Sequence, residues 1–174
     1  MRIEGLKFPY ELKLYSTDDP DFVEHWRITY PYDATMDEII VASAFSYVCL
    51  IRKGTSPIFT GEVLNYQFEF PLSYLKWFIG VLSRFQLKPN QGGYPPGTFA
   101  DDLQMDEENM LFVKRGQNFD LGGIFGYHLE NRRRHSYIDK DIRQRFFISD
   151  EYLFELGMMD ALIQIEQDYS DGKL

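Results

Sequence analysis

Apolar and polar residues alternate with a period of two over several stretches of the chain. Such alternation places one set of side chains on each face of a β-strand. It predicts four long strands and two shorter ones, over residues 6–14, 25–30, 64–70, 119–130, 109–115 and 142–148. Each strand has one apolar and one polar face, which is typical of an antiparallel sheet with one face in water. Pro9 lacks a backbone N–H group, so the strand over residues 6–14 is expected at a sheet edge.

The segment between Thr35 and Ile51 carries signals of both helix and strand. Thr35 and Glu38 have the spacing of a capping box, and the apolar residues that follow fall on one helical stripe. The sequence therefore favours a helix over residues 36–51. Its β-branched content leaves a strand alternative open from Ile39 to Ile51.

Two later segments predict helices. Pro71 suits the first position of a helix, and residues 71–86 are apolar around most of the helical circumference, which is typical of a central, buried helix. Ser149 is a good N-cap, and the two acids after it favour the positive end of the helix dipole. This C-terminal helix is expected to run to about Asp168, with a bend at Gly157.

Together these elements predict an α+β fold. We expect a twisted antiparallel sheet of five or six strands, one buried central helix on its apolar face, and a C-terminal helix that closes one end. A length of 174 residues fits a single domain over residues 1–174, in which residues 169–174 form a frayed tail. A core of this size needs no metal or disulfide to be stable.

Cysteine usage and hydropathy predict a cytoplasmic protein. Cys49 is the only cysteine, so no intrachain disulfide can form, and its apolar sequence neighbours indicate a buried, inert thiol. Residues 1–15 lack the continuous apolar run of a signal peptide, and no apolar stretch approaches the ~18 residues of a membrane span. We therefore expect no membrane partner.

The formal net charge of −9 disfavours anionic partners. Such a surface repels phosphate backbones and anionic lipids and attracts basic surfaces, so no direct binding of nucleic acid is expected. The simpler alternative is that the charge only keeps the protein soluble.

Acidic residues concentrate in three segments, residues 17–38 with net −6, residues 101–108 with net −5 and residues 149–174 with net −6. The middle segment follows a loop rich in Gly and Pro that contains aromatic residues. Interfaces combine buried aromatic anchors with a charged frame. The predicted partner-binding residues are Tyr94, Phe99, Asp101, Asp102, Asp106, Glu107 and Glu108. The alternative is a solvated acidic surface.

Residues 131–145 reverse the charge. They hold five Arg and one Lys against two Asp, a net charge of +4, so the rest of the chain carries −13. Arginine-rich loops bind phosphate or carboxylate in a bidentate way, which makes an RNA-contacting loop at Arg132–Arg134 one interpretation. The other is that these arginines pair with the protein's own acids or form a solvated turn, and the acidic background favours it.

No catalytic or cofactor motif stands out in the sequence. His128, Glu130 and His135 are the nearest approach to a metal or catalytic cluster, but any half-exposed strand presents such pairs. The glycines within residues 122–126 lack the strand–loop–helix context of a phosphate loop, and they indicate a bulge or the close approach of another backbone. No cofactor and no metal are expected.

The sequence thus favours a binding module over an enzyme. The leading hypothesis is an acidic inhibitor or immunity-type protein that masks a basic enzyme, such as a toxin or nuclease, by carboxylate mimicry of phosphate. The alternative is a small enzyme whose polar sheet face carries its site, which requires the strands of the two histidines to be neighbours. The residues of that site are His25, Arg27, His128, Glu130 and Arg132. A third hypothesis is a homo-oligomer that pairs through the edge strand 6–14.

Overall fold

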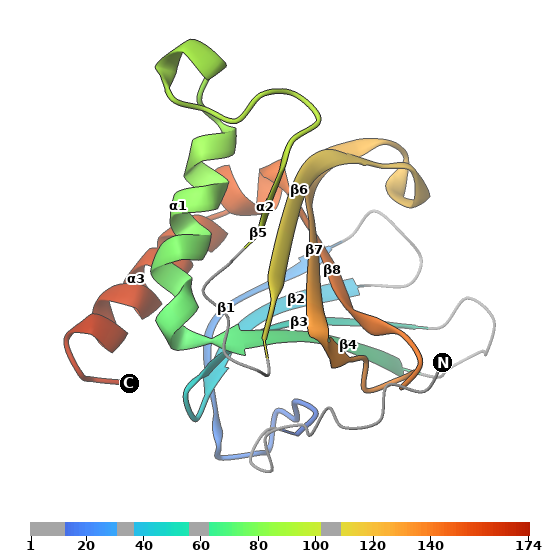
Figure 1. Ribbon diagram of the computed structural model, residues 1–174. Coiled ribbons are helices and arrows are strands. Elements are labelled where there is room, and N and C mark those ends of the chain that lie inside the picture. Colours follow the sequence, from blue (N-terminus) through green and yellow to red (C-terminus); the bar gives the residue numbers. More distant parts are fainter. Residues whose placement is uncertain (1–12, 31–36, 56–62, 102–108) are drawn as a thin grey trace.

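The computed structural model describes residues 13–30, 37–55, 63–101 and 109–174. These residues form an α+β fold with two antiparallel four-stranded sheets and three α-helices (Figure 1). Sheet 1 has the strand order β1 (Phe22–Tyr30), β2 (Asp37–Ala44), β3 (Tyr47–Thr55), β4 (Val63–Pro71). Sheet 2 has the order β5 (Phe99–Asp101), β6 (Leu111–Asn118), β7 (Ile124–His135), β8 (Arg143–Ser149). The helices are α1 (Leu75–Phe85), α2 (Asp150–Phe154) and α3 (Met158–Ser170).

The α+β class is confirmed, whereas the single sheet of five or six strands is wrong. After β4 the chain enters α1 and a loop, and β5 then starts a second sheet because it does not pair with β4. Within each sheet every strand pairs with its neighbour in sequence, so the topology is two meanders joined by a helix. In Figure 1 the strands of sheet 2 cross in front of those of sheet 1.

The predicted helix over residues 36–51 is wrong, and the strand alternative is right. β2 and β3 form a hairpin whose turn holds Phe45 and Ser46, while Thr35 lies outside the described residues. Alternate residues of the hairpin face opposite sides of the sheet. One set packs in the main core and comprises Ile39, Val41, Val48 and Leu50. The other set forms a second apolar cluster on the opposite face and comprises Ile40, Ala42, Cys49 and Ile51. A strand that is buried on both faces reads as a continuous apolar run, which periodicity cannot separate from a buried helix.

Helix α1 forms where it was predicted but does not occupy the centre of the fold. It begins at Leu75, after a single 3-10 turn over Leu72–Tyr74. One face buries apolar side chains, among them Phe78 and Leu82, and the opposite face exposes Lys76. The helix therefore covers one side of the molecule, beside α3 (Figure 1).

The predicted C-terminal helix is divided in two. Ser149 is the N-cap of α2, as expected, and its side chain accepts a hydrogen bond of 3.1 Å from the backbone N–H of Tyr152. Gly157 adopts a φ of 86°, a left-handed conformation that interrupts a helix and suits glycine. The chain thus turns at Gly157 and continues as α3 to Ser170.

Strand β7 is shifted relative to its prediction over residues 119–130. It begins at Ile124, because Phe119–Leu121 form a 3-10 turn and both Gly122 and Gly123 have positive φ. It then continues through the arginine run to His135.

The predicted edge strand over residues 6–14 lies outside the described residues, apart from Lys13 and Leu14, which are not in a strand. The strands predicted over residues 25–30, 64–70 and 142–148 are present as β1, β4 and β8.

One main core joins both sheets and all three α-helices. It contains Phe68 of β4, Leu129 of β7, Phe78 of α1, Leu153 of α2 and Leu162 of α3. The second apolar cluster lies on the far face of sheet 1, where Tyr15 and Phe22 cover it. Sheet 1 is therefore covered on both faces, whereas the residues of β6, β7 and β8 alternate between buried and exposed, as the sequence pattern predicts for a sheet with one wet face.

The turn of the β2–β3 hairpin generates a prediction about stability. Among the described non-glycine residues only Phe45 has a positive φ, 53°, at the first turn position, where hairpins favour glycine. Its side chain is 46% exposed and contributes little packing. We predict that Phe45→Gly raises the free energy of unfolding by about 0.5–1 kcal/mol, measured by urea denaturation. Phe45→Ala is the matched control, because it removes the same ring but keeps the unfavourable φ; an equal effect of both substitutions would contradict the prediction.

Candidate functional site

Phe99 and Asp101, two of the predicted partner-binding residues, lie on β5 at the edge of sheet 2. Phe99 is 52% exposed, and its ring centroid lies 4.8 Å from that of Phe112 on β6. Asp101 is partly exposed and pairs in register with Phe112. Since residues two apart on a strand share a face, an exposed ring and a carboxylate stand together on this face. The other acids of the segment, Asp102, Asp106, Glu107 and Glu108, lie outside the described residues.

Tyr94 lies at the C-terminal end of α1 and is partly buried. Its ring centroid is 4.5 Å from that of Phe85, and the guanidinium of Arg84 lies 4.4 Å from the same ring. The loop is held close to the helix here, because a Cβ atom at Gly93 would lie only 1.9 Å from the backbone oxygen of Leu87. Tyr94 therefore packs the loop against α1, while Phe99 faces solvent on a different element.

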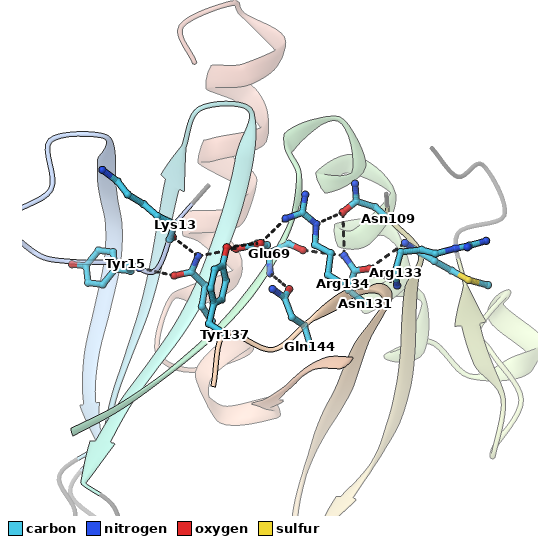
Figure 2. A network of polar contacts seen from close by, with 11 residues as sticks. Lys13, Tyr15, Glu69, Asn109, Asn131, Arg133, Arg134, Tyr137 and Gln144 are labelled. Carbon is cyan, nitrogen blue, oxygen red and sulfur yellow. Dashed lines mark hydrogen bonds and ion pairs between the residues drawn. The ribbon is translucent and has the colours of Figure 1, made fainter. Parts of the chain in front are cut away.

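A buried polar network joins the two sheets (Figure 2). Glu69 of β4 is fully buried, and its carboxylate forms an ion pair of 2.5 Å with Arg134 of β7, which is 3% exposed. The hydroxyl of Tyr137 donates to the same carboxylate at 2.9 Å. Burial, and then the charge of Glu69, raises the pKa of the Tyr137 hydroxyl, so it remains a donor. A buried carboxylate without such partners would strongly destabilise the fold, so these contacts are structurally required.

The network also fixes the N-terminal segment. The Nε2 group of Gln67 donates to the carboxylate of Glu69 at 2.7 Å and to the backbone oxygen of Lys13 at 3.0 Å. In return, the backbone N–H of Tyr15 donates to Oε1 of Gln67 at 2.7 Å. These contacts hold the segment that covers the second apolar cluster.

Two side-chain amides from sheet 2 form hydrogen bonds with the backbone at the free edge of sheet 1. β4 is an edge strand, so the backbone N–H and C=O of Glu69 have no strand partner on that side. Gln144 Oε1 accepts from this N–H at 3.1 Å, and Asn131 Nδ2 donates to this C=O at 3.1 Å. The side chain of Asn109 accepts from both Asn131 and Arg134, which closes a ring of hydrogen bonds. Sheet 2 thereby satisfies an edge that would otherwise bury unpaired backbone groups.

A register shift in β7 allows Asn131 and Arg134 to reach the same glutamate. In a regular strand, residues three apart point to opposite faces. The pairing of β7 with β8 shifts between Asn131 and His135, and irregularities of this kind re-aim side chains.

The sequence pattern placed Glu69 on a solvated strand face and so missed this network. A contact between residues 65 apart leaves no local signal in a single sequence.

The other paired arginines of the basic segment surround Glu130 on the outer face of sheet 2. The carboxylate of Glu130 lies 3.1 Å from the guanidinium of Arg145, and 3.6 Å from those of Arg132 and Arg143. Together with Arg134, four of these arginines pair with the protein's own acids. This arrangement matches the interpretation in which the arginines of residues 131–145 pair with the protein's own acids.

The two histidines of the alternative enzyme site are not on neighbouring strands. His25 lies on β1 of sheet 1, and His128 lies on β7 of sheet 2. His25 Nε2 forms a hydrogen bond of 2.7 Å with Ser43 Oγ, and burial lowers the pKa of His25. His128 Nε2 lies 3.0 Å from the backbone oxygen of Gln117. The neighbouring strands that this hypothesis requires are therefore absent from the described sheets.

Cys49 is a fully buried thiol on β3, paired in register with Glu69. Burial, reinforced by the Glu69 carboxylate, raises the pKa of this thiol well above its usual value. It therefore stays protonated and unreactive, as its apolar sequence context predicts.

In the described part of the chain, no group of three or more His, Cys, Asp or Glu side chains is placed to hold a metal ion. No helix there is long and apolar enough to cross a membrane.

No protein-family model matches the sequence, and no curated protein is similar to it. Function is therefore inferred from the residues themselves.

The buried ion pair leads to a prediction about stability. We predict that Arg134→Met destabilises the fold by about 3–5 kcal/mol, because the Glu69 carboxylate then stays buried without a cation. Adding Glu69→Gln should restore part of this loss, since the double variant removes both charges and keeps an acceptor for Tyr137. Urea denaturation of the single and double variants measures both effects.

Arg145→Met is the matched control for the buried arginine. It removes an ion pair of 3.1 Å with Glu130, but the side chain of Arg145 is 68% exposed, so the cost should stay below about 1 kcal/mol. Equal costs at Arg134 and Arg145, or a double variant less stable than Arg134→Met, would show that the buried pair does not stabilise the fold as inferred.

Proposed function

We propose that the chain is a cytoplasmic acidic protein-binding module, an inhibitor or immunity-type protein that masks a basic enzyme such as a nucleic-acid-directed toxin. Its carboxylates imitate the phosphates that the active site of that enzyme is built to hold. One observation carries the proposal: the acidic segment begins at Asp101, the last residue of an exposed edge strand, two residues after the exposed ring of Phe99.

The strand provides a rigid base for such a contact. Ala100 is buried in the main core, whereas its neighbours Phe99 and Asp101 stand on the opposite face of β5. An aromatic anchor and a charge held on a packed strand lose little conformational entropy when a partner binds. This arrangement favours a preformed contact surface over a flexible one.

The C-terminal helices, on the other side of sheet 2, add only a long-range attraction for a cationic partner. Glu155 and Asp160 are exposed, and Asp168 and Asp171 share Lys173 as an ion-pair partner. This part of the chain therefore presents an excess of acid to solvent. Such a field raises the association rate of an oppositely charged protein and weakens as salt is added.

Charge reversal of the segment tests the proposal. The tagged chain is used to capture proteins from lysate of its source organism at low and high salt, next to a variant with Asp101, Asp102, Glu107 and Glu108 changed to Lys. We predict that the parent retains a stoichiometric basic protein that high salt releases. Binding of that purified protein to the variant should be weaker by about 100-fold or more, because interface hot spots contribute roughly 2–4 kcal/mol each.

A second variant distinguishes a specific role of residues 101–108 from an effect of net charge alone. It changes the same number of exposed acids elsewhere to Lys, namely Asp18, Glu155, Asp160 and Asp171. We expect it to keep most of the affinity. Full affinity in the first variant, or equal losses in the two, would remove residues 101–108 as the binding site.

A further inference from the structure

The outer face of sheet 2 carries two rows of side chains that each cross all four strands. The cross-strand register places four residues side by side in the first row, in the order Phe99, Lys114, His128, Phe147. The second row has the order Asp101, Phe112, Glu130, Arg145. None of these side chains is buried by the described residues. Because neighbouring strands lie about 4.8 Å apart, each row spans about 14 Å.

Aromatic rings stand at both ends of this face. The rings of Phe99 and Phe112 have centroids 4.8 Å apart, and those of His128 and Phe147 are 4.9 Å apart. The guanidinium of Arg132 lies over the ring of Phe112, 4.2 Å from its centroid. Flat rings interleaved with cations form a surface on which planar, negatively charged molecules can stack.

Cations outnumber anions among the described side chains of this face. Lys114 joins the three arginines around Glu130, and Asp101 is the second acid, so these six side chains carry a net charge of +2. Three guanidinium groups on one carboxylate leave donors for a further anion. The described side chains of this face are thus basic in sum, although the whole chain carries −9.

The acidic C-terminal helices lie on the other side of the sheet. Tyr152 of α2 and Leu162 of α3 pack in the main core with Tyr127 and Leu129, whose side chains point inward from β7. The acidic side chains of α2 and α3 are therefore separated from the outer face by the sheet itself. At physiological salt the Debye length is about 8 Å, which screens much of their repulsion.

Although the net charge of −9 led us to expect no direct binding of nucleic acid, we propose that the outer face of sheet 2 binds a short single-stranded segment of nucleic acid. Several RNA-binding modules stack unpaired bases on aromatic side chains of an open antiparallel sheet while cations hold the phosphates. Here Phe147 stacks a base, and Arg143 and Arg145 contact phosphates. The residues assigned to these contacts lie on β8, and the inference does not depend on the proposed masking of a basic enzyme.

The test measures fluorescence anisotropy of a labelled uridine RNA of about twelve nucleotides, titrated with the intact protein at physiological salt of about 0.15 M. We expect a Kd on the order of 10⁻⁴ to 10⁻⁶ M and a weaker complex with a duplex of equal length. Phe147→Ala should weaken binding by about 5- to 150-fold, the effect of losing one stacked base. Arg145→Gln should lower the slope of log K against log salt by about 0.7, the contribution of one phosphate.

Matched controls change the same residue types elsewhere. Phe45→Ala removes an exposed ring from the other sheet, and Lys76→Gln removes an exposed cation from α1, so neither should change RNA affinity. Arg145 is 68% exposed, and Arg145→Gln therefore tests the face even if Phe147→Ala impairs folding.

Three results would overturn the proposal. The first is no binding of RNA up to roughly 100 µM protein, the weak end of non-specific affinity. The second is unchanged affinity in both Phe147→Ala and Arg145→Gln. The third is a poly-glutamate peptide that binds as tightly as RNA with no loss in Phe147→Ala, which would assign the face to an acidic protein instead.

Discussion

A fully buried carboxylate at a sheet edge constrains the rest of this structure. Glu69 lies on β4, where the backbone has no strand partner, and its charge lies outside the reach of water. Both the backbone and the charge must therefore be satisfied by sheet 2, which supplies Gln144, Asn131 and Arg134. An apolar contact between the sheets could slide, whereas this set of directed contacts fixes one relative position, and so positions the outer face that carries the candidate surfaces.

The register shift in β7 decides how the arginine run is used. Arg134 turns inward to Glu69 and lies 4.6 Å from the ring of Tyr47, while Arg132 stays on the outer face with Glu130 and Phe112. Neighbouring arginines therefore have different roles, one in holding the sheets together and one on a surface. The acidic residues also have different roles. Glu69 and Glu130 form ion pairs with arginines of the chain, whereas Asp101 begins an acidic segment with no Lys or Arg nearby in the sequence.

Local signals in the sequence predicted much of the secondary structure, and long-range pairing limited the rest. Alternation identified β1, β4, β6 and β8, and the N-cap at Ser149 was correct, because these features depend on neighbouring residues. The β2–β3 hairpin was predicted only as the alternative to a helix, because both of its faces are buried, which removes the alternation that marks a strand. The same reasoning could name Phe99 and Asp101 but not the rows that cross sheet 2, since those depend on the register of four strands.

Hydrogen exchange at the backbone amide of Glu69 tests the central claim most directly. The N–H of an edge strand normally exchanges quickly, but here it donates to Gln144 Oε1 at 3.1 Å beneath a second sheet. We predict that it exchanges as slowly as the amide of Leu50 on the interior strand β3, and that Gln144→Ala accelerates it selectively. Rapid exchange of the Glu69 amide in the parent protein, at the rate of an unprotected amide, would contradict the network that joins the two sheets.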